Sequence, residues 1–214
     1  MDEEVAIIDE KTRNEKIKNF IIENKKSIIV IISIMIISLI AIFTFNEIKK
    51  NNKISIADSY NRIITDFEIG KKNNISNDLK NIIKKLDTTY SPLALFFLID
   101  NNLIENTKEG NILFDIVINE TKLEREIKNL TIYKKALFNS DLISENELLN
   151  ILNPIIGSKS VWKPHTLFLM GEYFYSKGEK EKARSFFDEI LTLKDINNDI
   201  VTETQKRISR DYSE

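Results

Sequence analysis

Few residues in this chain have the types and the spacing that catalysis requires. Its 214 residues include one histidine and no cysteine, so neither a histidine-based zinc site nor thiol chemistry can be assembled. A histidine that stands alone, as His165 does, more often packs in a core or lines a groove than acts as a catalyst. The sequence therefore predicts no cofactor and no metal, and it disfavours an enzyme.

Two further patterns match catalytic motifs only in part. Gly70-Lys71 fits the end of a phosphate-binding loop, but Thr65 stands where the first glycine belongs and Lys72 where serine or threonine should follow. This glycine is expected to end a helix instead. Glu179 and Glu181 alternate with lysines, as on a solvated helix face. What remains for this chain is binding, and binding needs elements that place side chains on one surface.

The stretch from Ser27 to Phe45 contains no charged residue. At about 1.5 Å of rise per residue, a helix of this length is close to the roughly 30 Å hydrocarbon core of a bilayer. The sequence therefore predicts one transmembrane helix at 27–45. No small-x-small cleavage site follows it, so we expect an uncleaved signal anchor.

Lysine and arginine near a span are retained preferentially in the cytoplasm, and they set its orientation. Six precede this span, at Lys11, Arg13, Lys16, Lys18, Lys25 and Lys26, and three follow it closely, at Lys49, Lys50 and Lys53. The bias predicts a cytoplasmic leader at 1–26 and a periplasmic domain at 46–214, in the inner membrane of a bacterium. The leader is expected either to enforce this topology as a solvated segment or to serve as a cytoplasmic contact arm.

The part after the span is long enough for one globular domain with a real core. The formal net charge of the chain is −2, which argues against nucleic acid as a partner because nucleic acid requires a basic face. Apolar residues recur at spacings of three and four, beginning with a predicted helix over Ile54–Ile69, and no long stretch alternates with period two. The fold class is therefore all-α.

Several helix boundaries can be predicted from local motifs. Thr121–Glu124 and Ser144–Glu147 both have the spacing of a capping box, so each is expected to begin a helix. The helix that starts after Ser144 is expected to end at Asn153-Pro154. Pro164–Lys177 and Glu179–Leu193 are expected to form two helices joined at Gly178, followed by a last helix from about Ile200 to Asp211.

The helix pair joined at Gly178 has a distinctive packing pattern. Gly171 and Ala183 are small and lie where two antiparallel helices would cross, while Phe174 and Phe187 fill the space beside them. This pattern resembles the 34-residue tetratricopeptide repeat, with Pro164 as its first position, Gly171 as its eighth and Gly178 as its fifteenth. Weaker units precede it, one of them with Gly110 and Phe114 as packing residues. The resemblance implies an α-solenoid of three to four helical hairpins covered by the last helix.

The order of the parts is a second resemblance. A charged leader, one anchor with its N-terminus inside, degenerate repeats, a late Trp162 and one clean C-terminal repeat are similar to a bacterial family of membrane-anchored tetratricopeptide-like proteins. That family includes the ancillary subunit of the SecYEG translocon (the YfgM type). The resemblance implies a non-enzymatic accessory protein of the Sec translocon or of the periplasmic chaperone network. Its protein partners would be the translocon, a membrane-anchored periplasmic folding factor or unfolded clients.

In tetratricopeptide arrays the first helix of each pair lines the concave surface. Carried over to this chain, its groove positions are His165, Phe168, Glu172, Tyr175, Tyr133 and Leu137. Their mixed aromatic and polar character suits an extended peptide or a partner helix. The alternative is that Phe168 and Tyr175 are buried by a neighbouring element, and Trp162 is expected to be a packing anchor between repeats.

Three functions therefore remain. The first is the translocon or chaperone accessory protein. The second is a structural scaffold of another envelope complex, which would co-purify with that complex without binding clients. The third is a hydrolase or transferase with an unconventional site, which would need a deep polar pocket with perturbed carboxylates.

Overall fold

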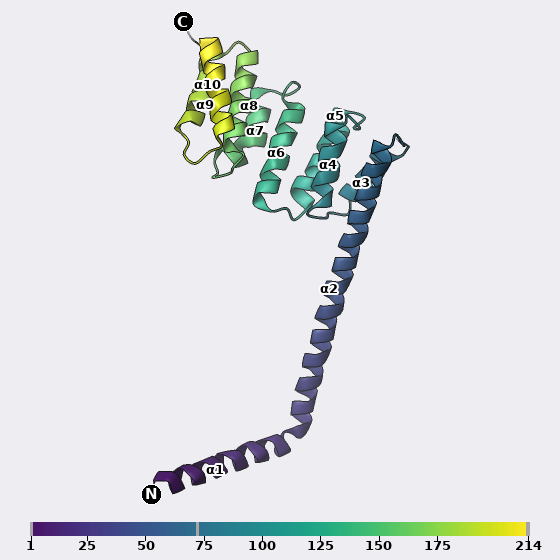
Figure 1. The fold of residues 1–214 in the computed structure, drawn as a ribbon, viewed down its shortest axis with the longest axis vertical. Coiled ribbons are helices and arrows are strands. Elements are labelled where there is room, and N and C mark those ends of the chain that lie inside the picture. The colour runs from purple at the N-terminus through teal and green to yellow at the C-terminus, as the bar shows by residue number, and fades with distance from the viewer. Residues whose placement is uncertain (1, 72, 213–214) are drawn as a thin grey trace. The chain divides into compact units, whose positions relative to one another are not determined.

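The computed structural model describes residues 2–71 and 73–212, and in this part of the chain every regular element is a helix (Figure 1). The all-α fold class is confirmed. The chain divides into two units, Met1–Ser55 and Ile56–Glu214, which are described separately below.

The first unit contains α1 (Asp2–Glu23) and most of α2 (Lys25–Glu68). α2 is long and apolar enough near the N-terminus to cross a membrane, a property that a signal sequence would share. From Ile29 to Phe45 its large apolar side chains are exposed. Two hydroxyls within this stretch bond back along the helix, Ser33 to the Ile29 carbonyl at 2.8 Å and Thr44 to the Ile40 carbonyl at 2.9 Å. These bonds satisfy polar groups that would be costly in hydrocarbon.

α2 does not stop where the apolar stretch ends. The predicted helix at Ile54–Ile69 is its last part, and α2 continues to Glu68 without interruption. The division between the two units falls inside this helix, after Ser55. Within the second unit, Tyr60 and Phe67 of α2 contact Tyr90 and Phe97 of α4, with ring centroids 5.6 and 5.1 Å apart. The end of α2 therefore belongs to the packed helical unit.

The second unit is a series of short helices that follow one another in chain order (Figure 1). After α2 come α3 (Ile75–Ile83), α4 (Tyr90–Asp100), α5 (Thr107–Asp115), a π-helical turn η1 (Ile116–Glu120), α6 (Arg125–Asn139), α7 (Glu145–Ile156), α8 (Lys163–Ser176), α9 (Lys180–Thr192) and α10 (Asn198–Tyr212). α3 packs on α4, α6 on α7 and α8 on α9. One core of apolar side chains runs through the series from Ile63 to Ile190.

α8 and α9 form the hairpin that the sequence predicted. Gly178 turns the chain between them with a left-handed φ of 78°, a conformation that favours glycine. Gly171 lies directly against the ring of Phe187, and a Cβ there would come within 2.7 Å of Cζ and 2.8 Å of Cδ1. Ala183 and Phe187 are fully buried, and Phe174 nearly so. The absence of a side chain at Gly171 thus allows the two helices to approach closely.

Gly110 and Phe114 of α5 pack in a related way, but against the next helix in the chain. A Cβ on Gly110 would come within 2.6 Å of Cε1 of Phe138, which belongs to α6. Phe114 is fully buried, and its ring centroid lies 5.7 Å from that of Phe138. These two residues therefore join α5 to α6.

The predicted helix boundaries have mixed outcomes. Ser144 and Glu147 form the predicted capping box, with both reciprocal hydrogen bonds present. The other predicted capping box is wrong: Thr121 is buried, its Oγ1 makes no described hydrogen bond, and α6 begins only after Glu124. The predicted end at Pro154 is also wrong, since α7 continues to Ile156. Ile155 is fully buried, and this packing holds the last turn although Pro154 cannot donate a backbone hydrogen bond.

Candidate protein-interaction site

Tyr133 of α6, with Trp162 and His165 at the start of α8, forms an aromatic cluster. The rings of Tyr133 and Trp162 are stacked, with centroids 5.9 Å apart and an interplanar angle of 22°. His165 lies 5.3 Å from Trp162 and 6.2 Å from Tyr133, measured between ring centroids. All three side chains are half-buried, so the cluster is fixed in place and still presents ring surface to solvent. Such rigid, partly exposed aromatic surface is typical of protein interfaces.

A hydrogen-bond network holds the chain segment that carries Trp162. One carboxylate oxygen of Glu126 accepts a hydrogen bond from the Ser160 hydroxyl at 2.7 Å and another from the Val161 amide at 3.2 Å. The Ser160 hydroxyl in turn accepts from the Trp162 amide at 3.1 Å. The bond from Ser160 is the main reason that the pKa of Glu126 lies below its ordinary value. Glu126 thereby fixes the position of Trp162 in the unbound chain. Less conformational entropy of this segment is then lost when a partner binds.

α6 presents an apolar and a charged side chain beside the cluster. Leu137 lies one helical turn after Tyr133, and 44% of its side chain is exposed. Lys134 donates to Asp100 of α4 at 2.9 Å, and its ammonium lies 5.0 Å above the ring of Phe96. Its charge is therefore already paired. Because α4, α6 and α8 each contribute, we call Phe96, Tyr133, Lys134, Leu137, Trp162 and His165 the interaction face.

A cavity of about 490 Å³ lies beside His165. Val161, Pro164, Ile196 and Ile200 supply much of its apolar wall. Lysines also line it, at Lys159, Lys163 and Lys194. His165 thus lies between the aromatic cluster and a hollow in the surface.

The imidazole of His165 is a natural reporter for this site. Burial lowers its pKa from the ordinary value of 6.5, and the Val161 backbone opposes this shift in part. Because the pKa is lower in the folded chain than in the unfolded one, the contribution of His165 to stability is fully present above about pH 6.5 and is lost as the pH falls through the folded-state pKa. We expect the resonance of this single imidazole, in the detergent-solubilised full chain, to titrate with a midpoint below 6.5. A midpoint at or above that value would show that the ring is not desolvated.

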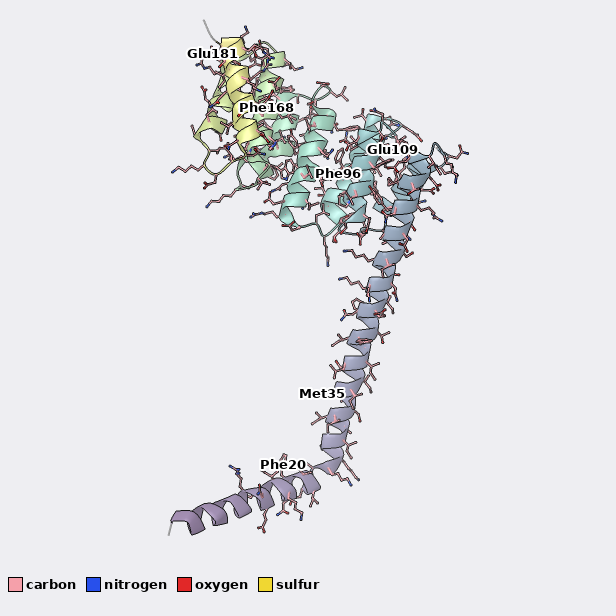
Figure 2. The ribbon with its side chains drawn as sticks, in the orientation of Figure 1. Phe20, Met35, Phe96, Glu109, Phe168 and Glu181 are labelled. Carbon is pink, nitrogen blue, oxygen red and sulfur yellow. The ribbon has the colours of Figure 1, made fainter. Side chains whose placement is uncertain are left out.

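The remaining predicted groove residues, Phe168, Glu172 and Tyr175, lie on the side of α8 that faces α10. Phe168 of α8, which is labelled in Figure 2, is half-buried. Its ring packs on that of Phe187, with centroids 5.4 Å apart. Glu172 accepts a hydrogen bond from Nη2 of Arg207 at 3.0 Å, and the same guanidinium lies 4.1 Å above the ring of Tyr175. The structure thus brings Tyr133, Leu137 and His165 together on the interaction face, whereas Glu172 and Tyr175 contact α10.

Sequence reasoning missed the residues that organise these surfaces. Glu126 and Ser160 meet across 34 residues, and Arg207 and Glu172 across 35. The only signal in the sequence was that these separations are close to the repeat length. Within the described residues no group of three or more histidine, aspartate or glutamate side chains could hold a metal ion.

Comparison of this chain with family models, with curated proteins and with solved structures finds no match.

Proposed function

We propose that this chain is a single-pass membrane protein whose helical unit, Ile56–Glu214, binds other proteins through the interaction face. The observation that carries the proposal is the aromatic cluster of Tyr133, Trp162 and His165 next to the exposed Leu137. Large aromatic side chains that are held rigidly and still reach solvent supply much of the binding energy at protein interfaces. An exposed leucine beside them adds apolar area that a partner can cover.

The proposal includes the tetratricopeptide-like arrangement. α6 with α7 and α8 with α9 would form the last two hairpins, with α10 covering the second of them. α4 with α5 would form a more open unit before them, because α3 packs more closely on α4 than α5 does. The close approach of Gly171 to Phe187 and the burial of Ala183 support this arrangement for the last pair. The fully buried Thr204 lies 33 residues after Gly171, one residue short of the 34-residue period at which the next unit would place a small residue. In such an array the interaction face is formed by the first helices of neighbouring hairpins.

The proposed membrane placement is supported by the length and apolar composition of α2 and by the charges that flank it. We propose that α2 crosses a bacterial inner membrane with the leader in the cytoplasm and the helical unit in the periplasm. There the unit would act as an accessory subunit of the Sec translocon or of the periplasmic chaperone network, with the translocon, a membrane-anchored folding factor or unfolded clients as partners. No catalytic step is part of this proposal. The second candidate remains a structural scaffold of another envelope complex.

Photo-crosslinking in cells tests the proposed function. A photoreactive amino acid is placed at Leu137 of the full chain, and the captured proteins are identified. We expect capture of translocon subunits, a folding factor or several secreted clients. Capture of one unrelated envelope complex would replace the accessory function with the scaffold, and no capture at all would contradict both.

A further inference from the structure

The contact of α10 with α8 is centred on one arginine. α10 also contacts α9 through Tyr212, whose hydroxyl donates to the Lys180 carbonyl at 3.0 Å and whose ring centroid lies 6.5 Å from that of Phe187. The Arg207 side chain is only 11% exposed, and its guanidinium forms a two-pronged ion pair with Glu172, in which Nη2 and Oε2 are 3.0 Å apart. The guanidinium also stacks over Tyr175 at 4.1 Å and pairs with Asp211 of α10 itself. Such a planar, two-pronged contact is specific to arginine, because lysine offers a single charge without the fork.

Apart from the contact of Arg207, α10 buries few apolar side chains. Of the residues of α10, Thr204 alone is fully buried, whereas α8 buries eight residues. Ile200, Ile208 and Tyr212 of α10 are half-buried. An element attached with little apolar burial is expected to open at a lower free energy than the helices of the core.

A hollow that is open to solvent lies beside the contact between α10 and α8. A cavity of about 400 Å³ is lined by residues of both helices, namely Phe168 and Glu172 of α8 with Glu203, Lys206, Arg207 and Arg210 of α10. The connection that precedes α10 is short, and Asp195 within it adopts a left-handed φ of 56°. α10 therefore leaves the surface of α8 around Phe168 and Glu172 partly accessible to solvent.

We propose that Phe168, Glu172 and Tyr175 form a docking site for an arginine-bearing helix, that α10 fills this site within the chain, and that a partner helix of the same pattern replaces it. The pattern is taken from α10: a small residue at the position of Thr204, an arginine three residues later at Arg207, and an aromatic residue at Tyr212. Residues at these spacings lie on one face of a helix. This arginine site shares no residue with the interaction face. Its test is therefore independent of the test of the proposed function.

The site is selective for its occupant. A helix without the arginine would leave Glu172 half-buried and without its ion-pair partner, which costs more than an exposed pair would gain. A helix in trans also competes with α10, whose short tether gives it an effective concentration on the order of millimolar. The partner therefore either fits the cavity better than α10 does or acts when α10 is open.

A synthetic peptide with the sequence of residues 198–212 is a direct probe of the site. We expect the full chain with Arg207→Glu to bind this fluorescent peptide at least about tenfold more tightly than the unaltered chain does. The substitution repels the tethered α10 from Glu172 and so weakens the competitor, although its contacts with α9 through Tyr212 remain. A peptide carrying Arg207→Ala should bind the same variant at least about tenfold more weakly. Gln205→Ala in the full chain is the matched control, because Gln205 is exposed and does not line the cavity, so its loss should leave peptide binding unchanged.

Equal binding of the peptide by the unaltered and Arg207→Glu chains, or by neither, would overturn the proposal. Hydrogen exchange of the unaltered chain gives a second test that does not depend on how the variant folds. We expect the amides of α10 to exchange faster than those of α8 and α9. Protection of α10 equal to that of α8 would mean that α10 does not open by itself, and it would overturn the replacement of α10 by a partner.

Discussion

Gly171→Val is expected to destabilise the hairpin of α8 and α9 strongly. A Cβ at this position would come within 2.7 Å of Cζ of Phe187, which is closer than carbon atoms can pack, and valine adds two further methyl groups. The ring cannot move aside easily, because Phe187 is fully buried and also contacts Phe168 and Tyr212. Overpacking of this kind costs about 3 kcal/mol or more, a large part of the roughly 5–15 kcal/mol that stabilises an ordinary domain.

The measurement is urea unfolding of the full chain in mild detergent, followed by the fluorescence of Trp162, the single tryptophan. Alanine substitutions provide a matched pair. A Cβ on Gly157 would lie 3.5 Å from the Asn153 carbonyl oxygen, an ordinary contact, so Gly157→Ala is expected to be neutral or to stabilise by up to about 1 kcal/mol. Gly171→Ala is expected to destabilise, because the clash outweighs the better helix propensity of alanine. The same sign for both would contradict the close approach of α8 and α9.

Phe114→Ala is expected to cost about 3–5 kcal/mol of unfolding free energy, the usual range for a fully buried phenylalanine. Phe114 has no exposed surface and contacts Phe138, so its removal leaves a cavity between α5 and α6. Phe186→Ala is the control, because Phe186 is half-buried and stacks on Phe174 with centroids 5.4 Å apart. It is expected to cost about 1–2 kcal/mol. If both substitutions cost the same, Phe114 does not join the two helices as described.

Local motifs predicted those parts of the fold that neighbouring residues determine. The hairpin of α8 and α9 could be predicted because Gly171, Gly178 and Ala183 each have one steric reason to be small. The capping box at Ser144 could be predicted because both of its bonds close within four residues. Thr121 shows the limit of this reasoning, since it has the same spacing but lies in extended backbone after the π-helical turn η1. Tertiary packing decided where α6 begins.

The candidate site was predicted only in part, since its remaining features depend on contacts that are distant in the sequence. Tyr133 and His165 were predicted to share a surface, and their rings do lie 6.2 Å apart. Trp162 was expected to pack between repeats, and it does contact Tyr133, yet it remains half-exposed because Glu126 fixes the preceding loop. That Arg207 would cover Glu172 and Tyr175 could not be predicted, because it requires α10 to fold back onto α8.

The interaction face is the central claim, and the affinity of the captured partner tests it most directly. The dissociation constant is measured for the unaltered full chain, for Leu137→Glu and for Ile112→Glu, with the fluorescence of Trp162 as the signal. Leu137 and Ile112 are comparably exposed, at 44% and 51%, but Ile112 lies on α5, which contributes no residue to the interaction face. We expect Leu137→Glu to weaken binding by about tenfold or more, which corresponds to about 1.4 kcal/mol, and Ile112→Glu to leave it unchanged. Equal effects, or an effect of Ile112→Glu alone, would show that the partner binds elsewhere.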